Sequence, residues 1–216
     1  MRGILMKENN LEPENFGEEG FENSNNASTN HLRAEILSYL QDIVHTLAVI
    51  LLVFLLLFRI VVVSGPSMKD TLVDGDYVLL VNNIFYRNQQ PGDIIVASKE
   101  SFREGEPIIK RIIATEGQTV DINFEEGLVY VDGVLQDEGY ISSPTMRYEG
   151  VNFPLEVAEG CVFVMGDNRM NSMDSRSGEI GQIDTRQILG KAVLIAFPGK
   201  DATTNTRQFD RIGGLS

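Results

Sequence analysis

The feature that most constrains this chain is an apolar run, IVHTLAVILLVFLLLFRIVVV, which extends from Ile43 to Val63. Its 21 residues carry a single formal charge, at Arg59. As a helix rising about 1.5 Å per residue, the run is long enough to cross the roughly 30 Å hydrocarbon core of a bilayer. The alternatives are a fully buried core helix, which needs a larger protein than 216 residues, and a cleaved export signal, which has a shorter apolar region near the N-terminus. We therefore predict a retained membrane anchor.

The residues before this run divide into two segments. Residues 8–30 contain six Glu, seven Asn and no Lys or Arg, so they cannot bury enough apolar surface to offset their ordering entropy. We predict that residues 1–30 form a disordered acidic tail. Residues 31–42 have apolar side chains at helical spacing and predict a short amphipathic lead-in to the anchor, so that 31–63 form one unit. The few basic residues on either side do not determine which way the anchor crosses the membrane.

Beyond Ser64 the sequence changes to short apolar and β-branched runs separated by Gly, Pro, Asn and Asp. Gly127, between two such runs, is typical of a hairpin turn that requires positive φ. The pattern predicts a mainly β fold, with an antiparallel, barrel-like β-rich domain over residues 64–198 after a single N-terminal transmembrane helix. We expect the polar residues 199–216 to fray. The clearest predicted strands are 76–83, 92–98, 107–115, 119–124, 128–133, 161–166 and 191–198.

Composition excludes several kinds of site and partner. The formal net charge is −13, and no cluster of Lys and Arg is present to bind phosphates, so we predict no nucleic-acid partner. Cys161 is the only cysteine, so no internal disulfide and no cysteine-based zinc site can form. The only histidines are His31 and His45. Any active site in the β-rich part must therefore work without imidazole, and we predict no cofactor and no metal.

Ser67 is a candidate nucleophile because it follows Gly65 and Pro66 in the stretch SGPS. Glycine permits unusual backbone angles and proline fixes φ, so the stretch is typical of a turn that exposes its side chains. A serine hydroxyl needs a base before it can attack a carbonyl, and without histidine that base is a carboxylate or a neutral lysine. The alternative is a plain turn at the end of the anchor.

Lys110 is the candidate base. In PIIKRIIAT the strand period of two places it on one face with Ile108, Ile112 and Ala114. Such neighbours desolvate the amine and lower its pKa, and about 4 kcal/mol would bring that pKa from about 10.4 to about 7 to 8. Two alternatives stay open, because both faces of the strand are apolar: Lys110 reaches solvent, or Arg111 faces the core instead.

The segment VMGDNRMNSMDSRSGEIG, residues 164–181, is dense in Asp, Asn and Ser. Its spacing does not fit a calcium loop, because Arg169, Ser172 and Gly178 stand at the third, sixth and twelfth positions counted from Asp167. A hydrogen-bonded loop fits better. We expect an ion pair between Asp174 and its neighbour two residues later, Arg176, to fix the loop's shape.

These segments, in this order after an apolar anchor, resemble those of bacterial type I signal peptidases. SGPSMKDTL resembles the S-M-x-P-T-L box that holds the nucleophile, and IIKRIIATEG resembles the lysine box. GDNRMNSMDSR resembles G-D-N-R-D-N-S-x-D-S-R, and the resemblance extends from about residue 35 to residue 198. It implies that Ser67 is the nucleophile and Lys110 the general base of a Ser-Lys dyad. It further implies that Ser172 orients the lysine amine, above an ion pair of Asp174 with Arg176.

The resemblance also implies how the turn supports the reaction. The backbone N–H of Ser67 would donate to the oxyanion of the tetrahedral intermediate. In some family members a serine two positions before the nucleophile is a second donor; here that position is Gly65, and Ser64 is the neighbouring candidate. Met68 matches the methionine of the nucleophile box.

Two further positions depart from the family pattern. Asp70 stands where the nucleophile box usually has proline, and Met170 stands where the later loop usually has aspartate. Neither is a member of the dyad. Both bear on the rigidity and pairing of their loops.

The function implied by the resemblance is removal of signal peptides from exported preproteins after small residues, often Ala-x-Ala, with the substrate bound as an added strand. The partners would be these preproteins and the lipid bilayer. The protein would cross the bacterial cell membrane once, with its catalytic domain on the extracytoplasmic face. The alternatives are a Ser-Lys maturase dedicated to a pilin or conjugation precursor, and an inactive, membrane-tethered domain that binds exported chains.

Overall fold

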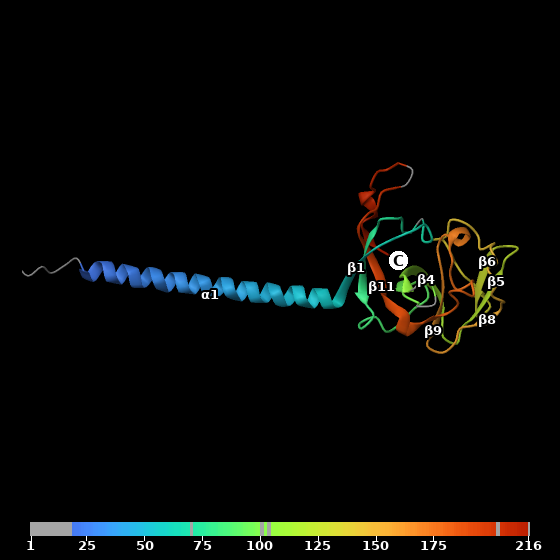
Figure 1. Cartoon of the computed structure of the whole chain (residues 1–216), viewed down its shortest axis with the longest axis horizontal. Helices are drawn as coiled ribbons and strands as arrows, with labels where there is room; N and C mark the ends of the chain where they lie inside the picture. Colours follow the sequence, from blue (N-terminus) through green and yellow to red (C-terminus); the bar gives the residue numbers. More distant parts are fainter. Residues whose placement is uncertain (1–18, 70, 100–101, 103–104, 202–203, 216) are drawn as a thin grey trace, which may run out of the picture. The chain divides into compact units, whose positions relative to one another are not determined.

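The computed structural model of the chain describes residues 19–69, 71–99, 102, 105–201 and 204–215, with side chains from residue 32 onward (Figure 1). Contacts divide the chain into two units, Met1–Leu52 and Val53–Ser216. The first is a helical unit and the second is built from β-strands, and each is described by itself.

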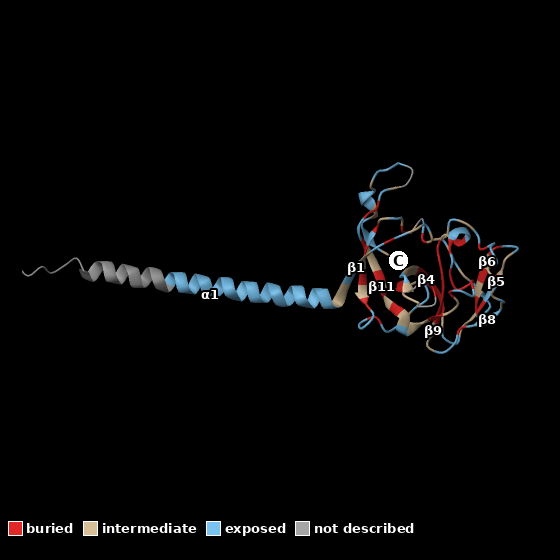
Figure 2. Cartoon of the chain, viewed as in Figure 1, coloured by how far each residue is buried: buried red, intermediate tan, exposed pale blue. Residues whose placement is uncertain are grey.

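Helix α1 extends over Glu19–Leu57. Its part from Leu32 to Leu57 contains an 18-residue window with a mean hydropathy of 2.3 and is long and apolar enough to cross a membrane. Side chains between residues 32 and 56 are exposed, as the pale blue helix in Figure 2 shows. Apolar side chains exposed along a whole helix are typical of a membrane span, whereas the apolar side chains of a core helix are buried.

The helix begins earlier than the sequence predicted. Residues 19–30 were expected to be disordered, but their backbone is helical and continuous with the apolar part. No Gly or Pro occurs between Gly20 and Gly65, so nothing in the sequence interrupts propagation, in which each added residue adds one hydrogen bond. The remainder of the predicted tail, residues 1–18, lies outside the described residues.

The helix also ends earlier than predicted, which corrects the span of 43–63. Leu57 is the last helical residue, and Phe58–Val62 form strand β1. This strand pairs antiparallel with β2, Tyr77–Asn82. Its β-branched residues favour a pleated strand, and pairing satisfies their backbone groups. The final apolar residues of the run are therefore part of a sheet that leads directly into the SGPS turn.

The larger sheet has the strand order β1-β2-β11-β3-β4-β9-β10, and β12 also pairs with β11. Every recorded pairing in it is antiparallel. Figure 1 shows the sheet curling, with β11 between β1 and β4. The mainly β, antiparallel fold predicted from the sequence is confirmed. The strands not yet given are β3 Ile94–Ala97, β4 Ile108–Thr115, β9 Cys161–Met165, β10 Ile183–Asp184, β11 Ile188–Phe197 and β12 Gly213–Gly214.

A second sheet has the order β7-β6-β5-β8. Its strands are β5 Thr119–Asn123, β6 Leu128–Val131, β7 Val134–Leu135 and β8 Leu155–Glu156. The predicted hairpin joins β5 to β6, and Gly127 has a φ of 72° as the turn requires. The described residues of this unit also form short 3₁₀ helices, η2 Arg169–Asn171, η3 Thr185–Gln187 and η4 Phe209–Arg211.

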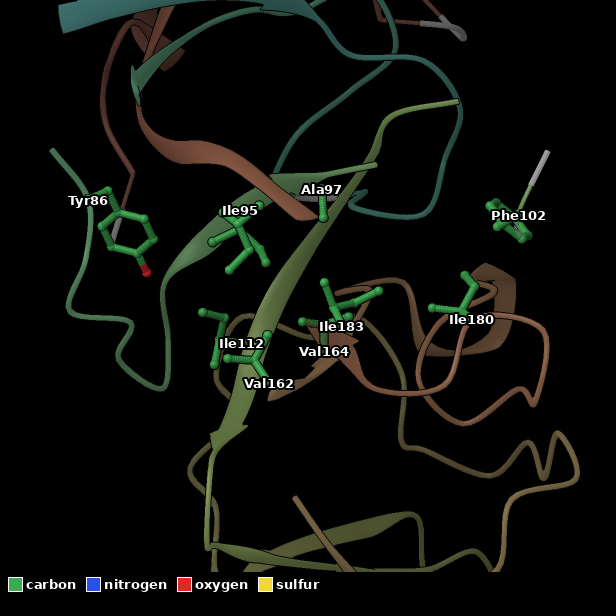
Figure 3. Close-up of a cluster of buried hydrophobic side chains, with 10 residues drawn as sticks. Tyr86, Ile95, Ala97, Phe102, Ile112, Val162, Val164, Ile180 and Ile183 are labelled. Atoms are coloured by element: carbon green, nitrogen blue, oxygen red, sulfur yellow. The ribbon is translucent and has the colours of Figure 1, made fainter. Parts of the chain in front are cut away.

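Three clusters of buried apolar side chains hold the β unit together. Figure 3 shows the first, in which Ile95 of β3 lies with Ile112 of β4 and Val164 of β9. The second includes Met68 and Leu72 and lies beneath the Ser67 turn. The third joins the end of β4 and β9 to the smaller sheet. Strand β4 contributes to all three, so its centre is enclosed.

One face prediction for β4 is wrong. Strict alternation put Ala114 on the face of Ile112 and Lys110, with Ile113 on the other face. The pairing of β4 with β9 shifts register between Ile112 and Ala114, and Ile113 and Ala114 both belong to the third cluster. A bulge adds one residue on one strand and interrupts the period of two.

The described residues near the C-terminus, 204–215, pack on the β unit and do not fray as predicted. Strand β12 pairs with Leu194 and Ile195 of β11. Beside it, the guanidinium of Arg211 donates to both carboxylate oxygens of Asp76, at 3.0 and 2.8 Å. Asp76 is completely buried, so the segment supplies a counter-charge that the interior requires.

We predict that Arg211→Met lowers the free energy of unfolding by about 2–3 kcal/mol, because Asp76 loses two charged hydrogen bonds in a buried site. Denaturation of the full chain in detergent micelles measures this. The matched control is Arg186→Met, since Arg186 pairs with Asp184 on the surface and should change stability little. Equal stability of both variants would show that the Asp76 contact contributes nothing.

Candidate active site

Ser67 lies on a tight turn that is held at both ends. Gly65 has a φ of 87°, a conformation that favours glycine. The N–H of Lys69 donates to the carbonyl of Pro66 at 3.1 Å, which closes the turn. Met68 is 1% exposed and packs into the second apolar cluster, which anchors the turn from below. The Ser67 side chain itself is partly exposed.

Asn168 fixes the turn from the opposite side. Its backbone N–H donates to the carbonyl of Ser67 at 3.0 Å, and its side-chain amide donates to the carbonyl of Pro66 at 3.1 Å. These two bonds connect the predicted nucleophile turn to the polar loop about a hundred residues later. The sequence marked Asn168 only as one polar residue among several.

Lys110 reaches Ser67 from near the start of β4. Its Nζ is 2.8 Å from Ser67 Oγ and 2.9 Å from the carbonyl oxygen of Ile109. Lys110 is 4% exposed, so the prediction of a desolvated lysine is confirmed and the solvent-exposed alternative is excluded. Lys69, which is nearer in sequence, is exposed. A buried amine in contact with a serine hydroxyl can accept its proton when the amine is neutral.

Both side chains open into a cavity of about 550 Å³. One wall is the end of β1 and the Ser67 turn, and another is the start of β4 with the residues before it. Asn171, Ser172 and Met173 close a third side. The cavity is thus bounded by two extended segments and by the polar loop, and it is lined by Val61–Met68, Val96, Phe102, Glu106–Lys110, Arg147 and Asn171–Met173.

The predicted ion pair of Asp174 with Arg176 is present beneath the cavity. The Nε of Arg176 lies 2.8 Å from Asp174 Oδ1, and both side chains are fully buried. Burial by itself raises the pKa of Asp174, but hydrogen bonds and charge from Arg176 outweigh it, so the pKa lies below its ordinary value. The carboxylate consequently stays charged as a fixed hydrogen-bond acceptor.

Ser172 is positioned by this carboxylate. Its hydroxyl donates to Asp174 Oδ2 at 2.8 Å, and the residue is 2% exposed. Because the proton of Ser172 points to Asp174, its lone pairs can accept from an amine in the cavity. Lys110 lines the same cavity.

A second buried ion pair was not anticipated. Arg111, next to Lys110, donates to Asp167 from Nε at 3.0 Å and from Nη2 at 2.8 Å. The hydroxyl of Thr71 donates to the same carboxylate at 2.5 Å. The sequence offered two signals: two adjacent charged residues, Lys110 and Arg111, in an otherwise apolar strand, and the polar loop that contains Asp167. These contacts tie β4, the turn region and the polar loop into one network.

Gly166 is the other residue whose importance the sequence did not reveal. A Cβ at this position would lie 2.5 Å from the carbonyl oxygen of Ser67 and 2.2 Å from Ser172 Oγ. Neither neighbour is the flexible end of a long side chain. Only glycine therefore lets the turn and the loop approach as closely as they do.

The structure distinguishes the two positions considered for the second oxyanion donor, Gly65 and Ser64. The N–H of Gly65 donates to Asp74 Oδ1 at 2.9 Å, so it is already engaged. Ser64 is exposed and lines the cavity. Asp70 lies outside the described residues. Among the described residues, no group of three or more His, Cys, Asp or Glu side chains is placed to hold a metal ion.

We predict that Gly166→Ala lowers the reactivity of the Ser67 hydroxyl by about 100-fold, because a displacement near 1 Å has effects of that size. The rate at which a serine-directed acylating reagent labels Ser67 in the full chain measures this. The control is Gly178→Ala in the same loop, where an added Cβ meets nothing within 4 Å. Equal labelling of the two variants would contradict the close approach.

Comparisons with known proteins identify the family of this chain. The family described as signal peptidase, peptidase S26, matches residues 36–197. A signal peptidase I of Bacillus licheniformis is 31% identical over 79% of this chain and 93% of its own. A probable signal peptidase I-1 of Synechocystis is 39% identical over 70% of this chain and 80% of its own.

A crystal structure of a signal peptidase I from Enterococcus faecalis V583 is 30% identical, with a TM-score of 0.41, and covers 49% of this chain and 97% of that one. The family match covers most of the chain, including the Ser67 turn, β4 and the polar loop. The chain therefore belongs to the S26 signal peptidases, the type I signal peptidase family, and is a peptidase.

Proposed function

We propose that the chain is a membrane-anchored endopeptidase that removes signal peptides from exported preproteins with a dyad of Ser67 and Lys110. The observation that carries the proposal is the 2.8 Å contact between Lys110 Nζ and Ser67 Oγ in a cavity. Membership of the signal peptidase family supplies the class of substrate. The β-rich unit has no histidine in any described position, so a lysine base is consistent with its composition.

In the proposed reaction, the neutral amine of Lys110 takes the proton of Ser67 as Oγ attacks the substrate carbonyl carbon. Lys110 then gives that proton to the leaving amine, and the acyl group stays on Ser67. Lys110 next takes a proton from water as the water oxygen attacks the acyl carbon. It returns this proton to Ser67 Oγ as the ester bond breaks, which releases the new carboxyl group and restores the Ser67 hydroxyl and the neutral amine. Ser172 orients the amine, because Asp174 fixes the direction of its hydroxyl.

In this proposal, the backbone N–H of Ser67 donates to the oxyanion and stabilises it. Gly65 is not the second donor, because its N–H is engaged with Asp74. The hydroxyl of Ser64, which lines the cavity, is the better candidate.

The substrate would lie extended between the end of β1 and the residues leading into β4. Strand addition of this kind uses backbone hydrogen bonds for affinity and pockets for specificity. Val63, Val96 and Ile108 line the cavity with apolar surface, which suits small apolar side chains before the cut. We propose cut sites of the Ala-x-Ala type, which present small side chains to this surface.

The anchor in this proposal is the apolar part of α1, Leu32–Leu57, in the bacterial cell membrane. The β-rich unit would lie on the extracytoplasmic face, where exported preproteins emerge. Along the chain, strand β1 and the few residues after it separate the last helical residue from the Ser67 turn. This short separation in sequence suits a substrate whose cut site follows its own membrane-embedded signal peptide.

We predict that Ser67→Ala and Lys110→Arg each lower preprotein cleavage at least about 1,000-fold, the scale of losses for members of a catalytic unit. Arginine keeps the positive charge but cannot become a neutral base. Cleavage of a preprotein by the full chain in detergent, resolved by mass shift, measures the loss. Ser172→Ala should be slower by about 10- to 100-fold and not inactive, as expected for a group that orients the base.

The matched control is Lys69→Ala, which removes the exposed lysine adjacent in sequence to the turn. Its cleavage rate should equal that of the wild type. Full cleavage by Ser67→Ala or by Lys110→Arg would eliminate the dyad, and an unchanged rate in Ser172→Ala would remove Ser172 from the site.

A further inference from the structure

Arg147 is a cationic residue on the cavity wall that the proposed reaction does not use. It lines the cavity beside Asn171 and Met173, and its side chain is 50% exposed. Three charged residues line this cavity in the described part of the chain: Glu106, Lys110 and Arg147. If Lys110 acts as a neutral base, Arg147 supplies the positive charge that a substrate meets.

The Arg147 side chain is held in place at this wall. Its Nη1 donates to the carbonyl of Met170 at 3.4 Å, and its Nε lies 3.3 Å from Glu149 Oε1. The backbone carbonyl of Arg147 accepts from Arg176 Nη1 at 3.4 Å, which links it to the buried ion pair. These contacts are long and involve two of the nitrogens of a guanidinium that carries five N–H donors. The group is thus positioned and still has donors to offer.

Glu149 offsets part of this charge. Its side chain is 6% exposed, and it lies near both Asp174 and Arg176. Burial raises the pKa of Glu149 above its ordinary value, the charge of Asp174 adds to the rise, and the charges of Arg176 and Arg147 oppose it. The pair with Glu149 covers only part of the guanidinium, because the Arg147 side chain stays 50% exposed.

Met170 adds no charge to this wall. The residue is an exposed methionine, and its carbonyl accepts from Arg147. An acidic side chain at this position would bring a carboxylate toward the guanidinium. The methionine leaves the charge of Arg147 available to a ligand.

The position of Arg147 assigns it to one side of the cut. The proposed substrate residues before the cut occupy the wall made by β1 and the start of β4. Arg147 lies instead with Asn171–Met173, on the side of the cavity formed by the polar loop. The substrate residues that follow the cut would therefore contact the wall formed by the polar loop.

We propose that Arg147 is a specificity-determining residue that favours Asp or Glu just after the cut in the substrate. The inference rests on the proposed function and deepens it. Since the guanidinium is half exposed, its pairing with a carboxylate is of the surface kind, which corresponds to a rate preference of about 3- to 5-fold.

The test compares two peptides that share one cut site and differ only in Glu or Gln at the first two positions after it. The full chain in detergent cleaves each, and the ratio of kcat/KM for Glu over Gln is the readout. We expect a ratio of about 3 to 5 in the wild type, falling to about 1 in Arg147→Met and retained in Arg147→Lys. Higher salt should lower the ratio, because the pair is exposed.

Two further variants make the test specific. Met170→Asp adds a carboxylate at the residue that Arg147 contacts. It should lower the ratio while Arg147 stays in place. Arg186→Met removes an exposed arginine that does not line the cavity and should leave the ratio unchanged. A merely structural role for Arg147 would alter both peptides equally and would not move the ratio.

The proposal is overturned by a wild-type ratio of 1, by a ratio that persists in Arg147→Met, or by a preference that maps to positions before the cut. These results differ from a failure of the proposed function. That failure would appear as cleavage of the Gln peptide that does not depend on Ser67.

Discussion

The close approach of the Ser67 turn to the polar loop is the constraint on which the rest of the site depends. It is possible because Gly166 has no side chain, and the two bonds from Asn168 hold it. Without this approach, Lys110 of β4 and Ser67 of the turn would belong to the same β unit but would not form a hydrogen bond. Serine and lysine are common residues, and only the distance of 2.8 Å between Lys110 Nζ and Ser67 Oγ makes these two a candidate dyad.

Buried charge gives this approach its rigidity. The pairs Asp174–Arg176 and Arg111–Asp167 lie under the cavity with almost no exposure. Such pairs contribute little net stability compared with apolar packing, but loss of one partner leaves an uncompensated charge. They therefore make alternative arrangements of the loop costly. The same network directs the hydroxyl of Ser172 and fixes the backbone of Arg147, so positioning of the base and recognition at the rim have one structural origin.

Several features were predictable from the sequence because they depend on local pattern. Alternating apolar runs gave the strands, the position of Gly127 gave the hairpin, and a lysine in an apolar strand gave a desolvated amine. The limits of the helix were less predictable. The run up to Val63 is uniformly apolar, and hydropathy alone does not distinguish a helical turn in lipid from a strand that pairs with β2. Pairing across the sheet decided that Leu57 is the last helical residue.

By itself, the sequence determined that the chain has an apolar helix, a β-rich unit without histidine, and a serine, a lysine and a polar loop in the order of one peptidase family. Only the tertiary structure decided which groups meet. It placed Asn168 on the Ser67 turn, showed why Gly166 must be glycine, joined Arg211 to Asp76, and brought Arg147 to the cavity. The physical reason is that each contact joins residues far apart in the chain, and sheet curvature, bulges and loop packing, which set those distances, leave no local pattern in the sequence.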